Sequence, residues 1–240
     1  LVASVALVTD DIMTAEYTVD FKKTHSQTLL PMLDEIVKLL DLDLDTIDAI
    51  AVAGGPGSFT GLRIGAATAK GLGLALKKPL VHVPTVDAMA YNMWGAEGLI
   101  CPIMDAKRSQ VYTGLYHTGN GLEVVMEQQP MDMRELAGLL NKKGERIIFL
   151  GDGVPVYKDI IREMLTVPYA FAPAQMNRQR AASVAALGMN ALLDARGCPG
   201  ARVVTAAQFT PDYLRKPQAE RQREAEQSAL GAAAKLPGDY

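Results

Sequence analysis

Cysteine is scarce in this sequence. Cys101 and Cys198 are the only two among 240 residues, and they show none of the spacing of a disulfide framework. This scarcity excludes a disulfide-stapled scaffold and is typical of a protein of the reducing cytosol. A chain of this length buries roughly 70–75% of the surface that its unfolded form exposes, so it needs neither disulfides nor a metal to fold. We therefore expect a cytoplasmic globular protein.

The sequence also lacks an excess of positive charge and any long hydrophobic run. It has 24 Lys and Arg against 27 Asp and Glu, for a formal net charge of −3. Proteins that bind nucleic acid unaided usually carry a basic excess, because neutralisation of phosphates dominates their affinity. We therefore expect any nucleic-acid role to depend on a partner. No run approaches the roughly 18 apolar residues of a membrane span, so no membrane association is expected.

The sequence has no initiating methionine. Residues 1–8 read LVASVALV and already have the pattern of a strand in the middle of a sheet. We expect that a preceding strand belongs to the natural protein and that the sequence is truncated at this point. No signal peptide is visible, and a truncated start makes that absence weak evidence.

The most unusual feature that is present is a glycine-rich loop at 54–65, GGPGSFTGLRIG. The apolar run at 47–53 before it predicts a buried strand, and the Ala-, Leu- and Gly-rich run at 62–76 after it predicts a buried helix. Thr60 is the predicted N-cap of that helix, because its hydroxyl can accept from free backbone N–H groups. A strand, a glycine loop and a helix N-terminus in this order can bind anions.

Known phosphate and nucleophile motifs do not match this loop. A Walker loop needs four residues between its glycines, then Lys and Ser or Thr, whereas Gly55 and Gly61 are separated by five residues. The dinucleotide fingerprint would need glycine where Thr60 stands, and a nucleophile elbow would need glycines around Ser58. A phosphate site and a catalytic Ser58 stay open as weaker alternatives to a structural or interface role. The predicted structural loop comprises Gly54, Gly55, Pro56, Gly57, Ser58 and Thr60.

Small residues recur every four positions along the predicted helix, and therefore lie along one side of it. They are Gly61, Gly65, Ala69 and Gly73. Glycine within a helix costs roughly 0.5–1 kcal/mol relative to alanine, so a close approach by another backbone must offset the cost. That backbone belongs either to the same domain or to another protein. Arg63 is unfavourable against the helix dipole, and we expect a carboxylate or a partner's backbone to hold it.

Strands and helices alternate along the rest of the chain. Further strands are predicted at 2–8, 14–19, 80–83, 100–104, 111–117, 123–128 and 146–150, and further helices at 26–40, 86–94, 131–140, 156–165 and 181–195. A similar order occurs twice, which predicts an α/β fold of two related halves. We expect a first subdomain at 1–98, a second at 99–215 and a charged tail at 216–240.

Histidine is too sparse to indicate a metal centre. The three histidines, His25, His82 and His117, never share the i, i+4 spacing of a metal-binding helix. We interpret His82 as a core or edge residue of an apolar strand with its polar atoms satisfied, and His25 as a polar residue beside a helix start at Ser26. A catalytic histidine is the weaker alternative.

Two acidic residues stand at predicted turns. Asp105 closes a strand and either sets the turn or binds a cation, and we favour the turn. Asp152 stands between two glycines, where it either stabilises a turn or faces a ligand across a cleft. Turn stabilisation is the more common role of such a residue.

Five segments together strongly resemble the bacterial TsaB (YeaZ) family. They are GGPGSFTGLRIG, HSQTLLP at 25–31, MDAKRSQVY at 104–112, LGDGVPVY at 150–157 and PDYLR at 211–215. The resemblance covers about residues 1–217 and implies two ribonuclease-H-like subdomains in tandem, as in the actin/Hsp70/sugar-kinase superfamily. The amino terminus departs from the family, which begins with a strand and a turn rich in Asp, Thr and Ser.

The resemblance implies a non-catalytic scaffold or dimerisation subunit of a tRNA-modifying complex. That complex transfers threonylcarbamoyl from threonylcarbamoyl-adenylate to N6 of the adenosine 3′ of the anticodon. The implied partners are a TsaD-like catalytic paralogue, a TsaE-like ATPase and tRNA through the complex only. The resemblance also allows a homodimer with a second copy of this chain. No cofactor is expected on this chain alone, and ATP or ADP and a metal ion are expected in the partner subunits.

The resemblance also implies a helical interface with the partner or with a second copy. The predicted interface residues are Leu29, Leu33, Ile36, Gly61, Arg63, Gly65, Ala69 and Gly73. A glycoprotease-like peptidase is the alternative function, because this branch of the superfamily carries a glycoprotease label. A peptidase would need a metal pair or an activated nucleophile, and the sequence offers neither.

Overall fold

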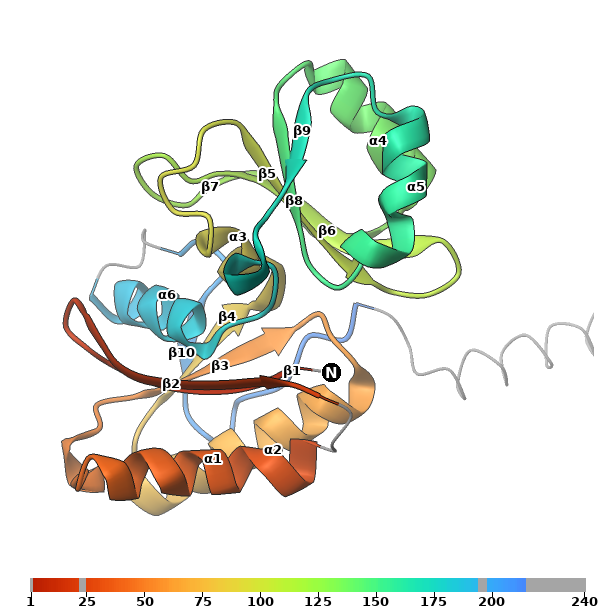
Figure 1. The fold of residues 1–240 in the computed structure, drawn as a ribbon. Helices are drawn as coiled ribbons and strands as arrows, with labels where there is room; N and C mark the ends of the chain where they lie inside the picture. Colours follow the sequence, from red (N-terminus) through yellow and green to blue (C-terminus); the bar gives the residue numbers. More distant parts are fainter. Residues whose placement is uncertain (1, 22–24, 194–197, 215–240) are drawn as a thin grey trace, which may run out of the picture.

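The computed structural model describes residues 2–21, 25–193 and 198–214, and it shows two α/β halves (Figure 1). The two halves share a run of elements in which a hairpin is followed by helix, strand, helix and strand, and in the second half the strand β5 precedes this run. The elements of the first half are β1 (Val2–Thr9), β2 (Ile12–Asp20), α1 (His25–Leu39), β3 (Ile50–Gly55), α2 (Phe59–Leu76), β4 (Leu80–Pro84) and α3 (Thr85–Tyr91).

The second half is built on a five-stranded sheet with the order β7-β6-β5-β8-β9. β5 lies at its centre, antiparallel to β6 and parallel to β8. Helices α4 and α5 cover one face of this sheet, and Leu99, Ile103 and Phe149 are fully buried in the core that they enclose. The elements of this half are β5 (Leu99–Asp105), β6 (Gln110–His117), β7 (Glu123–Asp132), α4 (Met133–Lys143), β8 (Ile147–Leu150), α5 (Val154–Met164) and β9 (Tyr169–Phe171).

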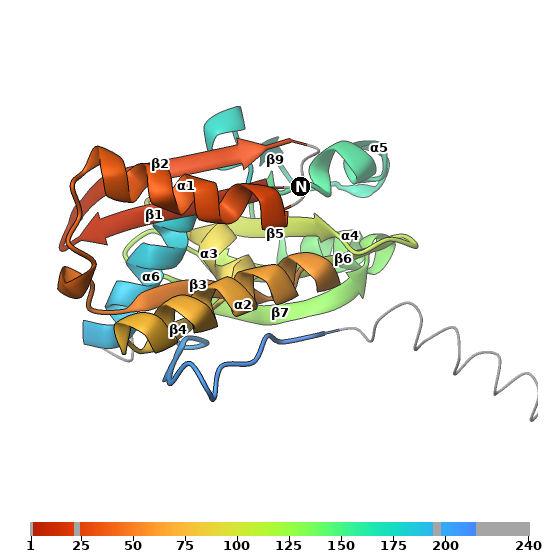
Figure 2. The same cartoon turned by 90° about the horizontal axis from the view of Figure 1, so that it is seen from below.

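The strands of the first half form two separate ladders. The hairpin β1–β2 is one, and β3, β4 and β10 (Arg202–Val204) form the other, with β3 parallel and β10 antiparallel to β4. Figure 2 shows α1 and α2 side by side across one face, with α1 over the hairpin and α2 over β3 and β4. The opposite face is covered by α6 (Ala181–Leu193), which packs on β1, β3 and β4.

The predicted α/β class and the repeated element order are confirmed, with shifts of a few residues at the helix ends. The helix predicted at 86–94 runs from Thr85 to Tyr91, and the strand predicted at 123–128 continues to Asp132. Two short strands, β9 and β10, escaped prediction. The division at residue 98 stays a prediction, and the structure places α6 and β10 against the first half. The tail at 216–240 lies outside the described residues.

Over the part of the chain that the structure describes, no helix has both the length and the apolar character needed to cross a bilayer.

The two ends of α4 show how capping residues set the length of a helix. Asp132 caps its start, with the carboxylate accepting from the Arg134 amide at 2.8 Å, and Gly144 ends it in the left-handed conformation at φ 73°.

Candidate functional site

The glycine loop joins the end of β3 to the start of α2, as the sequence predicts. The N-cap prediction was wrong by two residues: α2 begins at Phe59, and the cap is Ser58, whose Oγ accepts from the Gly61 amide at 3.1 Å. Thr60 lies within the first helical turn instead. Serine is as good a cap as threonine, so local sequence alone does not choose between them. The hydroxyl of Ser58 is therefore used by the helix.

The two glycines at the end of β3 are required by the protein's own close packing. A Cβ atom at Gly54 would collide with the imidazole of His82, which lies directly against it. Gly55 has φ +124°, a conformation that favours glycine, and a Cβ atom there would collide with the carbonyl oxygen of Asp212. Both positions thus have a reason to be glycine that involves no bound phosphate.

A segment near the carboxyl terminus, residues 209–214, lies over the loop as a strap. The Asp212 amide donates to the Gly54 carbonyl at 2.7 Å, and Asp212 Oδ2 lies 3.1 Å from His82 Nε2. The Arg202 guanidinium donates to both carboxylate oxygens of Asp212, at 2.9 and 3.1 Å. The strap therefore closes over the loop through backbone and side-chain contacts between residues about 130 to 160 positions apart in sequence.

Aromatic contacts extend the strap onto the first turn of α2. The rings of Phe59 and Tyr213 lie 5.1 Å apart between centroids, and the Arg63 guanidinium lies 3.9 Å above the Phe59 ring. Within the chain, Arg63 is therefore held by a cation–π contact, and its contact with a partner's backbone stays a prediction. Arg63 itself is exposed.

His82 is a core histidine, as predicted, but neither ring nitrogen has a hydrogen-bond partner among the described residues, so the expectation that its polar atoms are satisfied was wrong. Only 1% of its surface is exposed. Burial lowers the pKa of its imidazole, although the Asp212 carboxylate acts in the opposite direction. The imidazole is therefore neutral at pH 7 and fills the space beside Gly54. The side chain of His25 lies outside the described residues, and His117 Nε2 lies 3.4 Å from the Glu145 carboxylate.

A buried polar network connects the glycine loop to the second half. The Gly55 amide donates to Thr85 Oγ1 at 3.1 Å, and Gln128 Nε2 donates to the Gly55 carbonyl at the same distance. Tyr116 Oη donates to Asp87 Oδ1 at 2.7 Å. Burial raises the pKa of Asp87 to about 6, against the opposing effect of that hydrogen bond.

Sequence reasoning missed this network. Thr85 and Asp87 stand among mostly apolar residues, and Gln128 lies in a polar run far away in the sequence, so Asp87 within an apolar segment was the one available signal.

Asp105 sets the turn between β5 and β6, as predicted. Its Oδ1 accepts from the Lys107 amide at 2.9 Å, and Tyr157 Oη donates to the same oxygen at 3.1 Å. Partial burial acts to raise the pKa of Asp105, but the hydrogen bonds from Lys107 and Tyr157 outweigh it and hold the pKa below its usual range. Asp152 Oδ1 accepts from the Asp105 amide at 3.2 Å, so it ties the turn at 151–153 to the end of β5.

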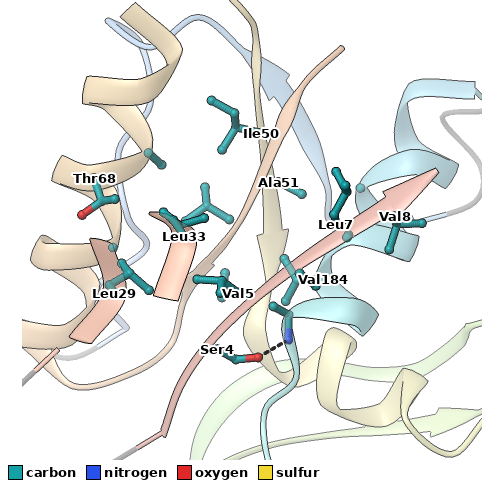
Figure 3. Close-up of a pocket in the computed structure, with 18 of the residues that line it drawn as sticks. Ser4, Val5, Leu7, Val8, Leu29, Leu33, Ile50, Ala51, Thr68 and Val184 are labelled. Carbon is teal, nitrogen blue, oxygen red and sulfur yellow. Dashed lines mark hydrogen bonds between the residues drawn. The ribbon is translucent and has the colours of Figure 1, made fainter. Parts of the chain in front are cut away.

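Six of the eight predicted interface residues line a large cavity in the first half (Figure 3). Its volume is about 1310 Å³, and it lies between β1 and β3 beneath α1 and α2. The six are Leu29, Leu33, Ile36, Gly61, Gly65 and Ala69. Gly73 is buried against Leu80 and Ala206, which is the close packing within one domain that the spacing also allowed.

The side chains that could bind a metal lie apart from one another, and the two cysteines are buried. Within residues 2–21, 25–193 and 198–214, no three His, Cys, Asp or Glu side chains gather as metal ligands would. Both cysteines are buried free thiols, and burial raises the pKa of Cys101 to about 12 and of Cys198 to about 11. These thiols are therefore protonated at neutral pH and are poor nucleophiles.

A protein-family comparison matches residues 19–223 to the family described as TsaD: tRNA N6-adenosine threonylcarbamoyltransferase. The "tRNA threonylcarbamoyladenosine biosynthesis protein TsaB" of Bacillus subtilis is 34% identical over 218 residues, which are 90% of this chain and 90% of that protein. The protein of the same name from Escherichia coli is 33% identical over 147 residues, or 56% of this chain and 63% of that protein.

A solved structure described as YeaZ from Pseudomonas aeruginosa superposes on this fold with a TM-score of 0.72 and 26% sequence identity. The match covers 89% of this chain and 94% of the other. Together with the family match, it confirms the predicted fold class of two ribonuclease-H-like subdomains in tandem.

Proposed function

The chain belongs to the TsaB family, and from this premise we propose that it serves in the biosynthesis of threonylcarbamoyladenosine in tRNA without catalysing the transfer itself. Its role is that of a partner subunit to a TsaD-like tRNA N6-adenosine threonylcarbamoyltransferase. That transferase moves threonylcarbamoyl from threonylcarbamoyl-adenylate to N6 of the adenosine 3′ of the anticodon. The complex works in the cytoplasm.

The observation that carries the non-catalytic role is the packed state of the glycine loop. The His82 ring and the backbone of Asp212 occupy the space beside Gly54 and Gly55. A phosphate-binding loop presents free backbone N–H groups to its ligand. Here the Gly55 amide donates to Thr85 and the Gly61 amide to Ser58, so these two donors of the loop serve the fold.

The charge of the chain supports a role through partners. At a net charge of −3, this chain has no basic excess to hold tRNA alone. We propose that tRNA binds through the complex, that ATP or ADP and a metal ion reside in the partner subunits, and that a TsaE-like ATPase joins the assembly. When this chain is not bound in the complex, we propose that it pairs with a second copy of itself.

Reconstitution tests this proposal. This chain, a cognate TsaD-like subunit, the ATPase, threonylcarbamoyl-adenylate and unmodified tRNA are combined, and the digested tRNA is analysed for the modified nucleoside by mass spectrometry. We expect the nucleoside to form only when this chain is present. Equal yield without the chain contradicts the proposal. A reaction lacking the TsaD-like subunit is the matched control, and any product there would assign catalysis to this chain.

The peptidase alternative has less support from the geometry. Ser58 Oγ accepts a hydrogen bond from the Gly61 amide as a helix cap, and activation of a serine needs a general base at hydrogen-bonding distance. A peptidase assay with and without a chelator distinguishes the two functions. Cleavage that is lost on Ser58→Ala or on chelation would favour the peptidase.

A further inference from the structure

In the described part of the chain, two connections join the halves, and they are the places where a hinge would lie. Residues 92–98 join α3 to β5, and residues 172–180 join β9 to α6. The first connection contains Gly95 and Gly98, both with positive φ. Hinge closure needs a few connecting residues that are free to change φ and ψ. The contacts of these two connections therefore decide whether the halves move relative to each other.

One asparagine fastens the two connections to each other. Asn92 directly follows the last residue of α3, and its Nδ2 donates to the carbonyl oxygens of Met176 at 3.1 Å and Arg178 at 2.7 Å. Its Oδ1 accepts from the Ser183 hydroxyl on α6 at 2.6 Å. A side-chain amide offers two N–H donors and one oxygen acceptor. Asn92 thus uses all of these groups to hold the second connection and the start of α6 against the end of α3.

The second connection is also fastened to both halves by its side chains. Asn177 Oδ1 accepts from the Gly151 amide of the second half at 2.7 Å. The neighbouring Arg178 forms an ion pair with Asp20 on β2 of the first half, at 2.9 Å. Two consecutive residues are therefore tied to opposite halves, and a change of φ or ψ between them would break contacts on one side or the other.

The first connection is fastened to the end of β6. The Gly95 amide donates to the Thr118 carbonyl at 2.7 Å, and the Thr118 hydroxyl donates to the Met93 carbonyl at 2.6 Å. Thr118 is fully buried. A buried hydroxyl that loses its partner is costly, so the contacts of Thr118 oppose rotation about the glycine.

A glutamine of the second half holds the other end of α3. Gln128 lies on β7, and its Nε2 donates to the Gly55 carbonyl, where β3 ends. Its Oε1 accepts at 3.2 Å from the amide of Val86, the second residue of α3. One side-chain amide thus bridges the glycine loop and the start of the helix. The hydrogen bond from Tyr116 to Asp87 lies directly beside this bridge.

These contacts are arranged around α3, which lies between the two halves (Figure 1) and whose residues 85–90 are buried. Gln128 acts at the start of this helix and Asn92 at its end. We propose that these two side-chain amides lock the halves in one relative arrangement, so that the described parts of both halves move as a single rigid body.

The lock has a consequence for binding. Proteins that close around a ligand keep the residues of their hinge free to move, whereas both connections of this chain are held by side chains. A subunit without interdomain motion loses little freedom when another molecule binds it, because its surface is already in the bound arrangement. The inference concerns the chain alone and does not rest on the proposed function.

A pair of spin labels, one on each half, measures the lock directly. Glu35→Cys on α1 and Glu163→Cys on α5 provide exposed labelling sites, while Cys101 and Cys198 are buried. Dilution with unlabelled protein restricts the measured distances to those within one chain. We expect one narrow distribution of distances between the labels. A broad or two-peaked distribution would overturn the proposal.

Removal of both amides tests whether they form the lock. Asn92→Leu and Gln128→Met keep the approximate volume of each side chain and remove its hydrogen bonds. In the chain that carries both substitutions, we expect the distance distribution to become at least about twofold wider, because the connections regain hinge freedom. A distribution as narrow as that of the parent would show that the amides are not the lock.

Asn141→Leu is the matched control. Asn141 Nδ2 donates to the Met164 carbonyl and its Oδ1 accepts from the Thr166 amide, both at 2.8 Å. This amide bridges two backbone groups as Gln128 does, but its partners all lie within the second half. We expect the distribution to stay narrow. Widening equal to that of the double variant would assign the effect to general loosening and would contradict the proposal.

Hydrogen exchange tests the lock without any substitution in it, and decides the matter if a variant fails to fold. The buried Val86 and Gly151 amides donate to Gln128 and Asn177 across the junction. In a locked chain, they should exchange within about tenfold of the rate of the β5–β6 ladder. Exchange about 100-fold or more faster than that ladder would show that the halves open separately, and would overturn the proposal.

Discussion

The two halves follow one order of elements but enclose their cores differently. In the second half, one cluster of buried residues unites β5, β6, β8, α4 and α5 around the central strand. In the first half, residues of β1 and α1 form one cluster, and residues of α2, β4 and the strap form another. The core of the second half is thus built around one central strand, whereas the core of the first half is divided between two ladders.

The largest loss of stability that we expect from this comparison is at the first residue of a strand. The strands compared are β8 and β3, which hold the same place in the element order of the two halves. Ile147 begins β8 and is fully buried, whereas Ile50 begins β3 and is only partly buried. Ile147→Ala should lower the free energy of unfolding by about 2–5 kcal/mol, as for other buried aliphatic residues. Ile50→Ala should cost less than half as much. Denaturant unfolding measures both, and equal losses would break the distinction between the halves.

The buried carboxyl that joins the halves should make stability depend on pH. Because the pKa of Asp87 is raised to about 6 in the folded state, from 3.8, the folded protein binds the proton more tightly than the unfolded chain. Its contribution is therefore fully present below pH 3.8 and is lost as the pH rises through 6. At about 1.4 kcal/mol per pH unit, the loss is about 3 kcal/mol at most.

Asp87→Asn separates this contribution from that of other groups. The amide oxygen can still accept from Tyr116, and the variant carries no charge to desolvate. The difference in free energy of unfolding between variant and parent should therefore shift in favour of the variant between pH 4 and pH 7. A difference that stays constant over this range would show that Asp87 does not link the halves as a buried acid.

An effect of intermediate size is expected at the glycine loop. Gly54→Ala places a methyl group against the His82 ring, so the ring or the strap must move, at a cost of about 1–3 kcal/mol. Gly57→Ala is the matched control, because its Cβ atom would meet only Leu62 at ordinary contact distance. Urea unfolding compares the two variants. Equal stability for both would mean that the His82 ring does not pack tightly against Gly54.

The smallest effect on the fold is expected at Arg63, the exposed member of the predicted interface. Its cation–π contact with Phe59 contributes about 0.5–1 kcal/mol at an exposed site, and Arg63→Ala should cost no more than this. If α2 contacts the TsaD-like subunit there, the same variant weakens that binding about tenfold or more, which calorimetry measures. Unchanged binding would remove Arg63 from the interface.

Local sequence patterns predicted the class of the fold and the order of its elements well. Apolar runs and a glycine loop mark β3 and α2 because strand and helix periodicity are properties of neighbouring residues. The reasons for Gly54 and Gly55 were not predictable, since they depend on His82 and Asp212, which pack on the loop from distant parts of the chain. The pairing of β10 with β4 was missed for the same reason.

The direction in which the small residues of α2 face was also beyond local prediction. Their spacing shows that Gly61, Gly65 and Ala69 share one side of the helix, but the identity of the neighbour on that side follows from the sheet beneath it. The two alternatives drawn from the spacing were packing within the domain and contact with a partner. Gly73 packs within the domain, and contact with a partner stays a prediction for Gly61, Gly65 and Ala69.

The pairing of β10 with β4 has a consequence for synthesis on the ribosome. The ladder of the second half is complete once residue 171 has emerged, because all five of its strands lie between Leu99 and Phe171. The ladder of the first half, although it begins earlier, gains its last strand only when residue 204 has emerged. The later-translated half therefore finishes first, and the earlier one must wait, with β4 exposed at its edge, until residue 204 has emerged.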